Sequence, residues 1–122
     1  MLRSMMQVYV RGSAEAVQSY QKAFGATLMS EYKNDDGNYL HAELNVFGQV
    51  LAVSELQEDM AVTGNTMQFC LHFGEADKEW VEKAFRVLEA GARIVCPLGP
   101  CPFSPCMVCF IDRFGVNWCL FV

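Results

Sequence analysis

A histidine and a glutamate two residues apart have the side-chain types and the spacing that proton transfer requires. His41 and Glu43 lie in a segment, 39–46, that alternates polar and apolar residues as a strand does. Residues two apart on a strand point to the same face, roughly 6.6 Å apart. Such a pair could remove and return a proton, with Glu43 as base or with His41 tuned by the carboxylate. The alternative, which we favour, is that the two residues are polar positions with no catalytic role. We still expect both side chains to contact a ligand.

Two further groups of polar side chains alternate with apolar residues, one near the N-terminus and one in the middle of the chain. They are Gln7, Tyr9 and Arg11, and Gln68, Cys70 and His72. We expect both groups to face one groove and to offer hydrogen-bond donors and acceptors to a small polar ligand. Arg11 and His72 stand near strand ends, and for these two we slightly favour simple solvation over a ligand role.

Two aromatic residues, Phe110 and Trp118, could supply an apolar wall to the same ligand site. A tryptophan in a strand more often packs in a core than against a ligand, so ordinary sheet packing stays open as the alternative. These two residues complete the predicted binding set together with Cys119.

The chain holds six cysteines, and four of them fall between residues 96 and 109. Cys106 and Cys109 have the CxxC spacing of zinc sites, but the intervening Met-Val is typical of a strand and would send the two thiols to opposite faces. Structural zinc, disulfide exchange and inert thiols are therefore the three interpretations, and we favour inert thiols.

The elements that position these side chains are repeated along the chain. Met67-Gln68 matches Met6-Gln7 at an offset of 61, and Lys83-Ala84-Phe85 matches Lys22-Ala23-Phe24 at the same offset. Phe114-Gly115 matches Phe47-Gly48 at an offset of 67. Three matches in the same order predict a duplicated unit of about half the chain.

Each half is predicted to run strand, helix, strand, strand, strand. In the first half, Ser13 is expected to cap the helix, Gly25 to end it, and 34–38 to form a hairpin turn. In the second half, Asp77 is the expected cap, and the proline-rich segment 97–105 is expected to be a loop or a sheet edge. The predicted segments are the strands 7–11, 26–33, 39–46, 49–54, 67–73, 93–96, 107–112 and 116–122, the helices 14–23 and 78–90, and a linker at 55–65.

Composition limits the classes of partner. A length of 122 residues suits one compact domain, and a net charge of −5 would repel nucleic acid and anionic membranes. The hydrophobic fraction of 52% favours a homodimer that covers apolar surface. The N-terminus lacks the apolar run of a signal peptide, and no segment approaches the length of a membrane span, so we expect a cytoplasmic protein with free thiols.

Three motifs give the sequence a family resemblance. The motifs are Gly12-Ser13-Ala14-Glu15-Ala16 followed by Tyr20 and Phe24-Gly25, then His41-Ala42-Glu43-Leu44, and finally the segment from Asp112 to Trp118. They resemble patterns of one group of small duplicated proteins. This group is the PhnB-like branch of the vicinal oxygen chelate superfamily, which includes glyoxalase I, extradiol dioxygenases and the bleomycin and fosfomycin resistance proteins. The resemblance covers nearly the whole chain.

The resemblance implies an α+β fold in which two βαβββ modules, about 1–58 and 66–122 of a single domain, form a curled mixed sheet with helices on its outer face. In metal-dependent members, the first and last strands of each module supply the ligands of a divalent ion. The matching positions here are Gln7, Ala52, Gln68 and Cys119. Alanine cannot bind a metal and two amides with one thiol are a poor set, so we expect no metal and no other cofactor.

The leading prediction is therefore a protein that binds a small polar metabolite without a metal. The alternative is a lyase, isomerase or dioxygenase relative that uses His41 and Glu43 with or without an ion. A purely structural interaction module is a third hypothesis. The predicted binding residues are Gln7, Tyr9, Gln68, Cys70, His72, Phe110, Trp118 and Cys119.

Overall fold

The structure is a computed structural model of the chain, and it describes residues 1–57 and 64–122. The chain divides into two compact units, unit 1 from Met1–Ala61 and unit 2 from Val62–Val122. Much of the linker predicted at 55–65 lies outside the described residues. Each unit is described by itself below.

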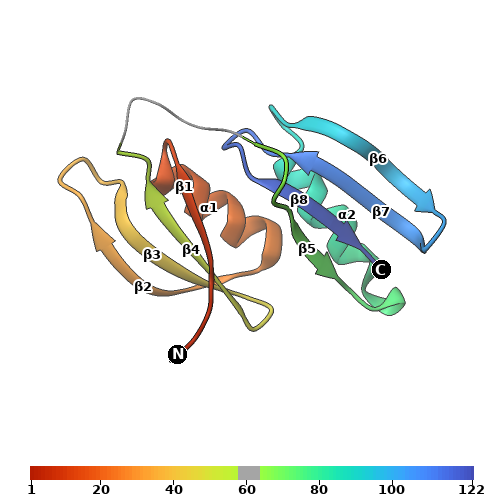
Figure 1. Cartoon of the computed structure of the whole chain (residues 1–122), viewed down its shortest axis with the longest axis horizontal. Helices are drawn as coiled ribbons and strands as arrows, with labels where there is room; N and C mark the ends of the chain where they lie inside the picture. The colour runs from red at the N-terminus through yellow and green to blue at the C-terminus, as the bar shows by residue number, and fades with distance from the viewer. Residues whose placement is uncertain (58–63) are drawn as a thin grey trace. The chain divides into compact units, whose positions relative to one another are not determined.

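Unit 1 contains one helix and a four-stranded mixed sheet (Figure 1). The strands lie in the order β1-β4-β3-β2, with β1 parallel to β4 and the other neighbours antiparallel. The elements are β1 (Met6–Val10), α1 (Ser13–Phe24), β2 (Thr27–Lys33), β3 (Tyr39–Val46) and β4 (Gln49–Glu55).

Unit 2 repeats this plan with the strand order β5-β8-β7-β6, in which β5 is parallel to β8. A short 3₁₀ turn, Glu75–Asp77, precedes its helix. The elements are β5 (Phe69–His72), α2 (Lys78–Leu88), β6 (Arg93–Cys101), β7 (Ser104–Ile111) and β8 (Asn117–Phe121). Both units are therefore βαβββ modules, and the predicted α+β class with a glyoxalase-like fold is confirmed.

Each helix packs its apolar stripe on one face of its own sheet. In α1 the apolar residues Val17, Tyr20 and Phe24 form one stripe and are at most 2% exposed. In α2, Phe85 meets Phe110 of β7 edge to face, with ring centroids 5.3 Å apart. Burying side chains of this size contributes about 1.5–3 kcal/mol each, so these stripes hold the helices in place.

The start of α1 differs from the prediction. Ser13 is already the first residue of the helix, and Gly12 before it has a left-handed backbone with φ of 77°. The carboxylate of Glu55, at the end of β4, accepts hydrogen bonds from the amides of Gly12 and Ser13 at 3.1 and 2.8 Å. The cap therefore comes from the neighbouring strand, and an anion at the helix N-terminus is favourable. Gly25 ends the helix in a left-handed conformation, as predicted.

The faces of β3 are also not a simple alternation. The pairing with β2 shifts between Tyr32 and Lys33, so that Leu40 is an extra residue without an opposite partner in the register. Leu40 is 58% exposed and Tyr39 is buried, the reverse of what a strict alternation with Ala42 and Leu44 would give. A bulge of this kind changes the face to which the strand end points.

The proline-rich segment is a sheet edge. β6 continues through Pro97 and Pro100 to Cys101 and pairs only with β7 in the sheet order, with irregular register. Proline lacks an amide donor and is tolerated there because the outer side of an edge strand needs none. Among the helices of the described residues, none is long and apolar enough to cross a membrane.

Candidate functional site

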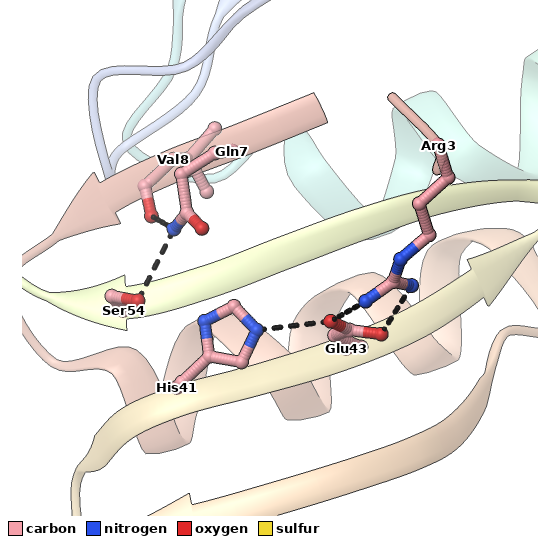
Figure 2. A network of polar contacts seen from close by, with 6 residues as sticks. All are labelled: Arg3, Gln7, Val8, His41, Glu43 and Ser54. Carbon is pink, nitrogen blue, oxygen red and sulfur yellow. Dashed lines mark hydrogen bonds and ion pairs between the residues drawn. The ribbon is translucent and has the colours of Figure 1, made fainter. Parts of the chain in front are cut away.

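A network of three charged or titratable side chains lies on the sheet of unit 1. Figure 2 shows Glu43 of β3 between His41, on the same strand, and Arg3, from the segment before β1. Nη1 and Nη2 of Arg3 donate to the two carboxylate oxygens of Glu43 at 2.8 and 2.7 Å. Nε2 of His41 lies 3.0 Å from Oε1 of Glu43. His41 and Glu43, which were predicted as a pair, are therefore in direct contact, and Arg3 is the third member of the network.

The two neighbours stabilise the ionised form of Glu43. Hydrogen bonds from Arg3 first, and from His41 second, lower the pKa of the Glu43 carboxyl from 4.5 to about 2, although its burial acts in the opposite direction. A carboxylate that is this stable as an anion is a weak base at neutral pH. Ionised Glu43 can only accept a hydrogen bond from His41. It therefore favours the tautomer of neutral His41 that carries hydrogen on Nε2 and a lone pair on Nδ1. If the pair does proton chemistry, His41 is the better base.

Cross-strand neighbours extend this polar face. Gln7 of β1 and Glu43 of β3 both pair with Ala52 of β4, so the three residues form one row across the sheet. Nε2 of Gln7 donates to Oγ of Ser54 at 3.1 Å, as Figure 2 shows. Tyr9 pairs with Ser54 and is 63% exposed. The predicted residues of unit 1 therefore share the sheet face opposite α1.

The predicted residues of unit 2 occupy the corresponding face of the second sheet. Cys70 and Cys119 are directly opposite each other on β5 and β8, and the ring of His72 stacks on Phe121 with centroids 4.3 Å apart. Gln68 lies just before β5, where its Nε2 donates to Oδ1 of Asn117 at 3.1 Å. These side chains thus line one sheet, but several of them already have partners.

Phe110 and Trp118 lie elsewhere, so the expectation that they form a wall of the ligand site is corrected. Both are 0% exposed, and they are paired on the sheet face that Phe85 of α2 covers. Nε1 of Trp118 donates to Oδ2 of Asp112 at 2.9 Å. The alternative of ordinary core packing holds for both residues.

The superfamily's metal position can be tested against the donors that are present. In unit 1 it contains Gln7 opposite Ala52, which has no donor atom. In unit 2 the predicted partners separate, because Cys119 lies opposite Cys70, and Gln68 binds Asn117. In the described part of the chain, no group of three or more His, Cys, Asp or Glu is arranged to hold a metal ion. The donor set does not fit a divalent ion.

Sequence reasoning missed two polar residues on this face of unit 1, Arg3 in the network and Ser54 beside Gln7. Arg3 stands in a segment before the first strand, where no periodicity indicates its direction. Its charge was a weak signal, since a carboxylate that is buried on folding, as Glu43 is, needs a cation nearby. Ser54 could have been found from the parallel pairing of the first and last strands, which aligns it with Tyr9.

Comparison with solved structures identifies the fold. The PhnB protein from Bacillus cereus has 24% sequence identity and a TM-score of 0.81, covering 98% of both chains. PA1353 from Pseudomonas aeruginosa has 24% identity and a TM-score of 0.79, covering 99% of this chain and 97% of its own. The fosfomycin resistance protein FosX from Mesorhizobium loti has 16% identity and a TM-score of 0.67, covering 97% and 88%.

At the level of sequence the comparisons find less. No protein-family model matches the chain. A search of curated proteins finds no match either. The duplicated βαβββ modules and the structural neighbours nevertheless agree, and the chain has the fold of the PhnB and FosX proteins.

Proposed function

We propose that this chain is a binding protein of the PhnB-like branch, which holds a small polar metabolite on the sheet face of unit 1 opposite α1. The observation that carries the proposal is the ordered network of Arg3, Glu43 and His41 on that face. Fixed polar side chains on a rigid sheet bind a ligand with little loss of conformational entropy.

The charges of the network favour an uncharged or zwitterionic ligand. The negative charge of Glu43 is balanced by Arg3, which binds both carboxylate oxygens. The partly exposed side chains of Gln7, Tyr9 and His41 then present mainly neutral donors and acceptors. A ligand rich in hydroxyl, carbonyl or amide groups matches this surface without burying an unpaired charge.

We propose that binding needs no divalent metal. The support is chemical, since Ala52 occupies the last-strand position of unit 1 and the amide of Gln7 beside it is a weak ligand for such ions.

We also propose that the chain is a cytoplasmic protein that forms a homodimer. The homodimer is supported by the apolar composition and by exposed apolar side chains such as Met29 and Tyr32 on β2. Light scattering at micromolar concentration tests self-association, and a monomer would contradict it.

A second candidate is an enzyme of the lyase or isomerase type that uses His41 as its base. The observation that favours it is the contact of 3.0 Å between Nε2 of His41 and ionised Glu43. A carboxylate that orients a histidine and stabilises its protonated form is a recurrent arrangement in proton-transfer sites. Glu43 would be the positioning residue and His41 the catalytic one.

Native mass spectrometry of the chain after incubation with pooled polar metabolites tests the binding proposal. We expect one retained small molecule per chain, with at least tenfold weaker retention in the His41→Ala variant. Leu40→Ala is the matched control, because Leu40 is the exposed neighbour at the bulge and should leave retention unchanged. Equal retention by both variants would overturn the proposed site, and chemical conversion of the retained molecule would favour the enzyme.

A further inference from the structure

Sulfur atoms are concentrated on one face of the sheet of unit 2. Cys119 of β8 pairs with Cys70 of β5 on one side and with Cys109 of β7 on the other, and Cys109 pairs with Cys96 of β6. One row of cysteines thus crosses all four strands of the sheet. Five of the chain's six cysteines lie in or against this row together with one methionine, and these residues are Cys70, Cys96, Cys101, Cys109, Cys119 and Met107.

The row faces away from α2. Phe110 packs on Phe85 of the helix, so its strand neighbour Cys109 points to the opposite face. Cys106 stands an odd number of residues from Cys109 on the same strand and shares the helix-facing side with Phe110. It is therefore a buried cysteine outside the row.

The centre of the row is enclosed and sulfur-rich. Cys109 and Cys119 are 8% and 6% exposed and share a hydrogen bond between their side chains. Met107 packs against both, and the thiol of Cys101 donates to its thioether at 3.8 Å. Thiolate and thioether donors select soft ions, Cu(I) above all, whereas carboxylate and water select hard ones.

The row of thiols suits a metal ion with two ligands better than a metal ion with four. Directly opposite residues on neighbouring strands have Cβ atoms about 4.5–5.5 Å apart, which places pairs of thiols side by side along a line. The described residues provide no group of three or more His, Cys, Asp or Glu around one point, whereas the tetrahedral coordination of zinc needs several such ligands. A linear bridge between two thiolates, by contrast, needs only one facing pair.

We propose that Cys109 and Cys119 bind one Cu(I) ion as a linear dithiolate, flanked by the thioether of Met107. Binding replaces two S–H bonds by two S–Cu bonds and releases two protons, with no change in oxidation state. Burial raises the pKa of both free thiols, so the metal must displace these protons. The site lies within one module. It shares Cys119 with the superfamily's divalent position, but its second ligand, Cys109, lies on β7 and its donors are softer.

Anaerobic competition between the reduced chain and a chromophoric Cu(I) chelator tests the proposal. We expect the chain to withhold one equivalent of Cu(I), and Cys109→Ala or Cys119→Ala to weaken binding at least about tenfold, since even outer-shell changes cost that much. Cys106→Ala is the matched control, and it should keep the full equivalent. Equal loss in all three variants, or no withheld copper in the wild type, would overturn the site.

X-ray absorption of the copper-loaded wild-type chain keeps the test independent of whether the variants fold. We expect only sulfur neighbours around copper, two of them at the short distance typical of linear coordination. Nitrogen or oxygen neighbours would place the ion elsewhere and refute the proposal. Metabolite retention through His41 is a separate measurement, so failure of either proposal leaves the other intact.

Discussion

The guanidinium of Arg3 binds both carboxylate oxygens of Glu43, with nitrogen to oxygen distances of 2.8 and 2.7 Å. This fork-like contact joins the segment before β1 to the centre of β3, 40 residues later in the chain. Bidentate pairs between arginine and a carboxylate are both directional and stronger than neutral hydrogen bonds. The contact therefore fixes the orientation of Glu43 and, through it, of His41.

The first prediction concerns the charge of Glu43. In the wild type, an NMR titration of its side-chain carboxyl should give a pKa of about 2, and Arg3→Gln should raise it, because the largest cause of the shift is removed. Arg93→Gln is the control, since it removes the same charge from an exposed position in unit 2. A pKa of Glu43 that is unchanged in Arg3→Gln would show that the pair does not persist in solution.

The same pair makes stability depend on pH with a definite sign. The folded-state pKa of Glu43 lies below the ordinary value of 4.5, so the pair stabilises the fold above about pH 4.5 and this contribution is lost as the pH falls towards 2. The free energy of unfolding of Arg3→Gln should therefore lie below that of the wild type at pH 7 and approach it at low pH. Denaturant unfolding at several pH values measures this difference, and a constant gap would contradict it.

The second prediction concerns the cap of α1. Glu55→Ala removes the acceptor of the Gly12 and Ser13 amides and of the Ser13 hydroxyl, and it should lower the free energy of unfolding by about 1–2 kcal/mol. Glu55→Gln should cost less because one oxygen remains. Asp35→Ala, in an exposed turn, is the control and should stay within about 0.5 kcal/mol of the wild type. Amide exchange at residues 12 and 13 should quicken only in the Glu55 variants.

Local patterns were sufficient to predict the order of the elements. The period of two in Ala42, Leu44 and Val46 and the stripe of Val17, Tyr20 and Phe24 indicate which face is buried. The burial of apolar surface is the main driving force of folding. The duplication made the topology predictable as well, because the order of the elements in one module predicts that of the other. Both sheets accordingly have the same strand order.

Contacts between elements that are far apart in the sequence could not be predicted from local patterns. The bulge at Leu40 comes from pairing with β2, and the cap of α1 comes from Glu55 on β4. Neither contact is indicated by the local sequence. The row of cysteines was hidden for the same reason, since spacings such as that between Cys109 and Cys119 acquire meaning only from the strand register.

The third prediction concerns the tautomer of His41. Ionised Glu43 accepts a hydrogen bond from Nε2, so the neutral ring should carry its proton there, which nitrogen-15 chemical shifts distinguish from the Nδ1–H form. Glu43→Gln should weaken this preference because a neutral amide is a poorer acceptor. The Leu40→Ala variant, with both members of the pair present, should leave the preference intact. An Nδ1–H ring in the wild type would remove the support for His41 as a base.

The last prediction concerns the turn between β7 and β8, which falls between the strands that the sequence predicts at 107–112 and 116–122. Oδ1 of Asp112 accepts from the amides of Phe114 and Val116 at 2.9 and 3.0 Å, while Oδ2 accepts from the Trp118 indole. Asp112 is only 4% exposed, so water cannot readily replace it.

Asp112→Ala would leave two amides and the buried indole nitrogen without this acceptor. Unsatisfied buried donors cost about 1–3 kcal/mol each, partly relieved by local relaxation, so we expect unfolding to become easier by about 2–3 kcal/mol. Denaturant unfolding followed by tryptophan fluorescence measures the loss. Asp77→Ala is the matched control, because Asp77 precedes α2 without a side-chain cap hydrogen bond and should cost far less. Equal losses in the two variants would mean that the turn is held by its backbone bonds and by Gly115, whose φ of 91° few other residues adopt, rather than by the carboxylate.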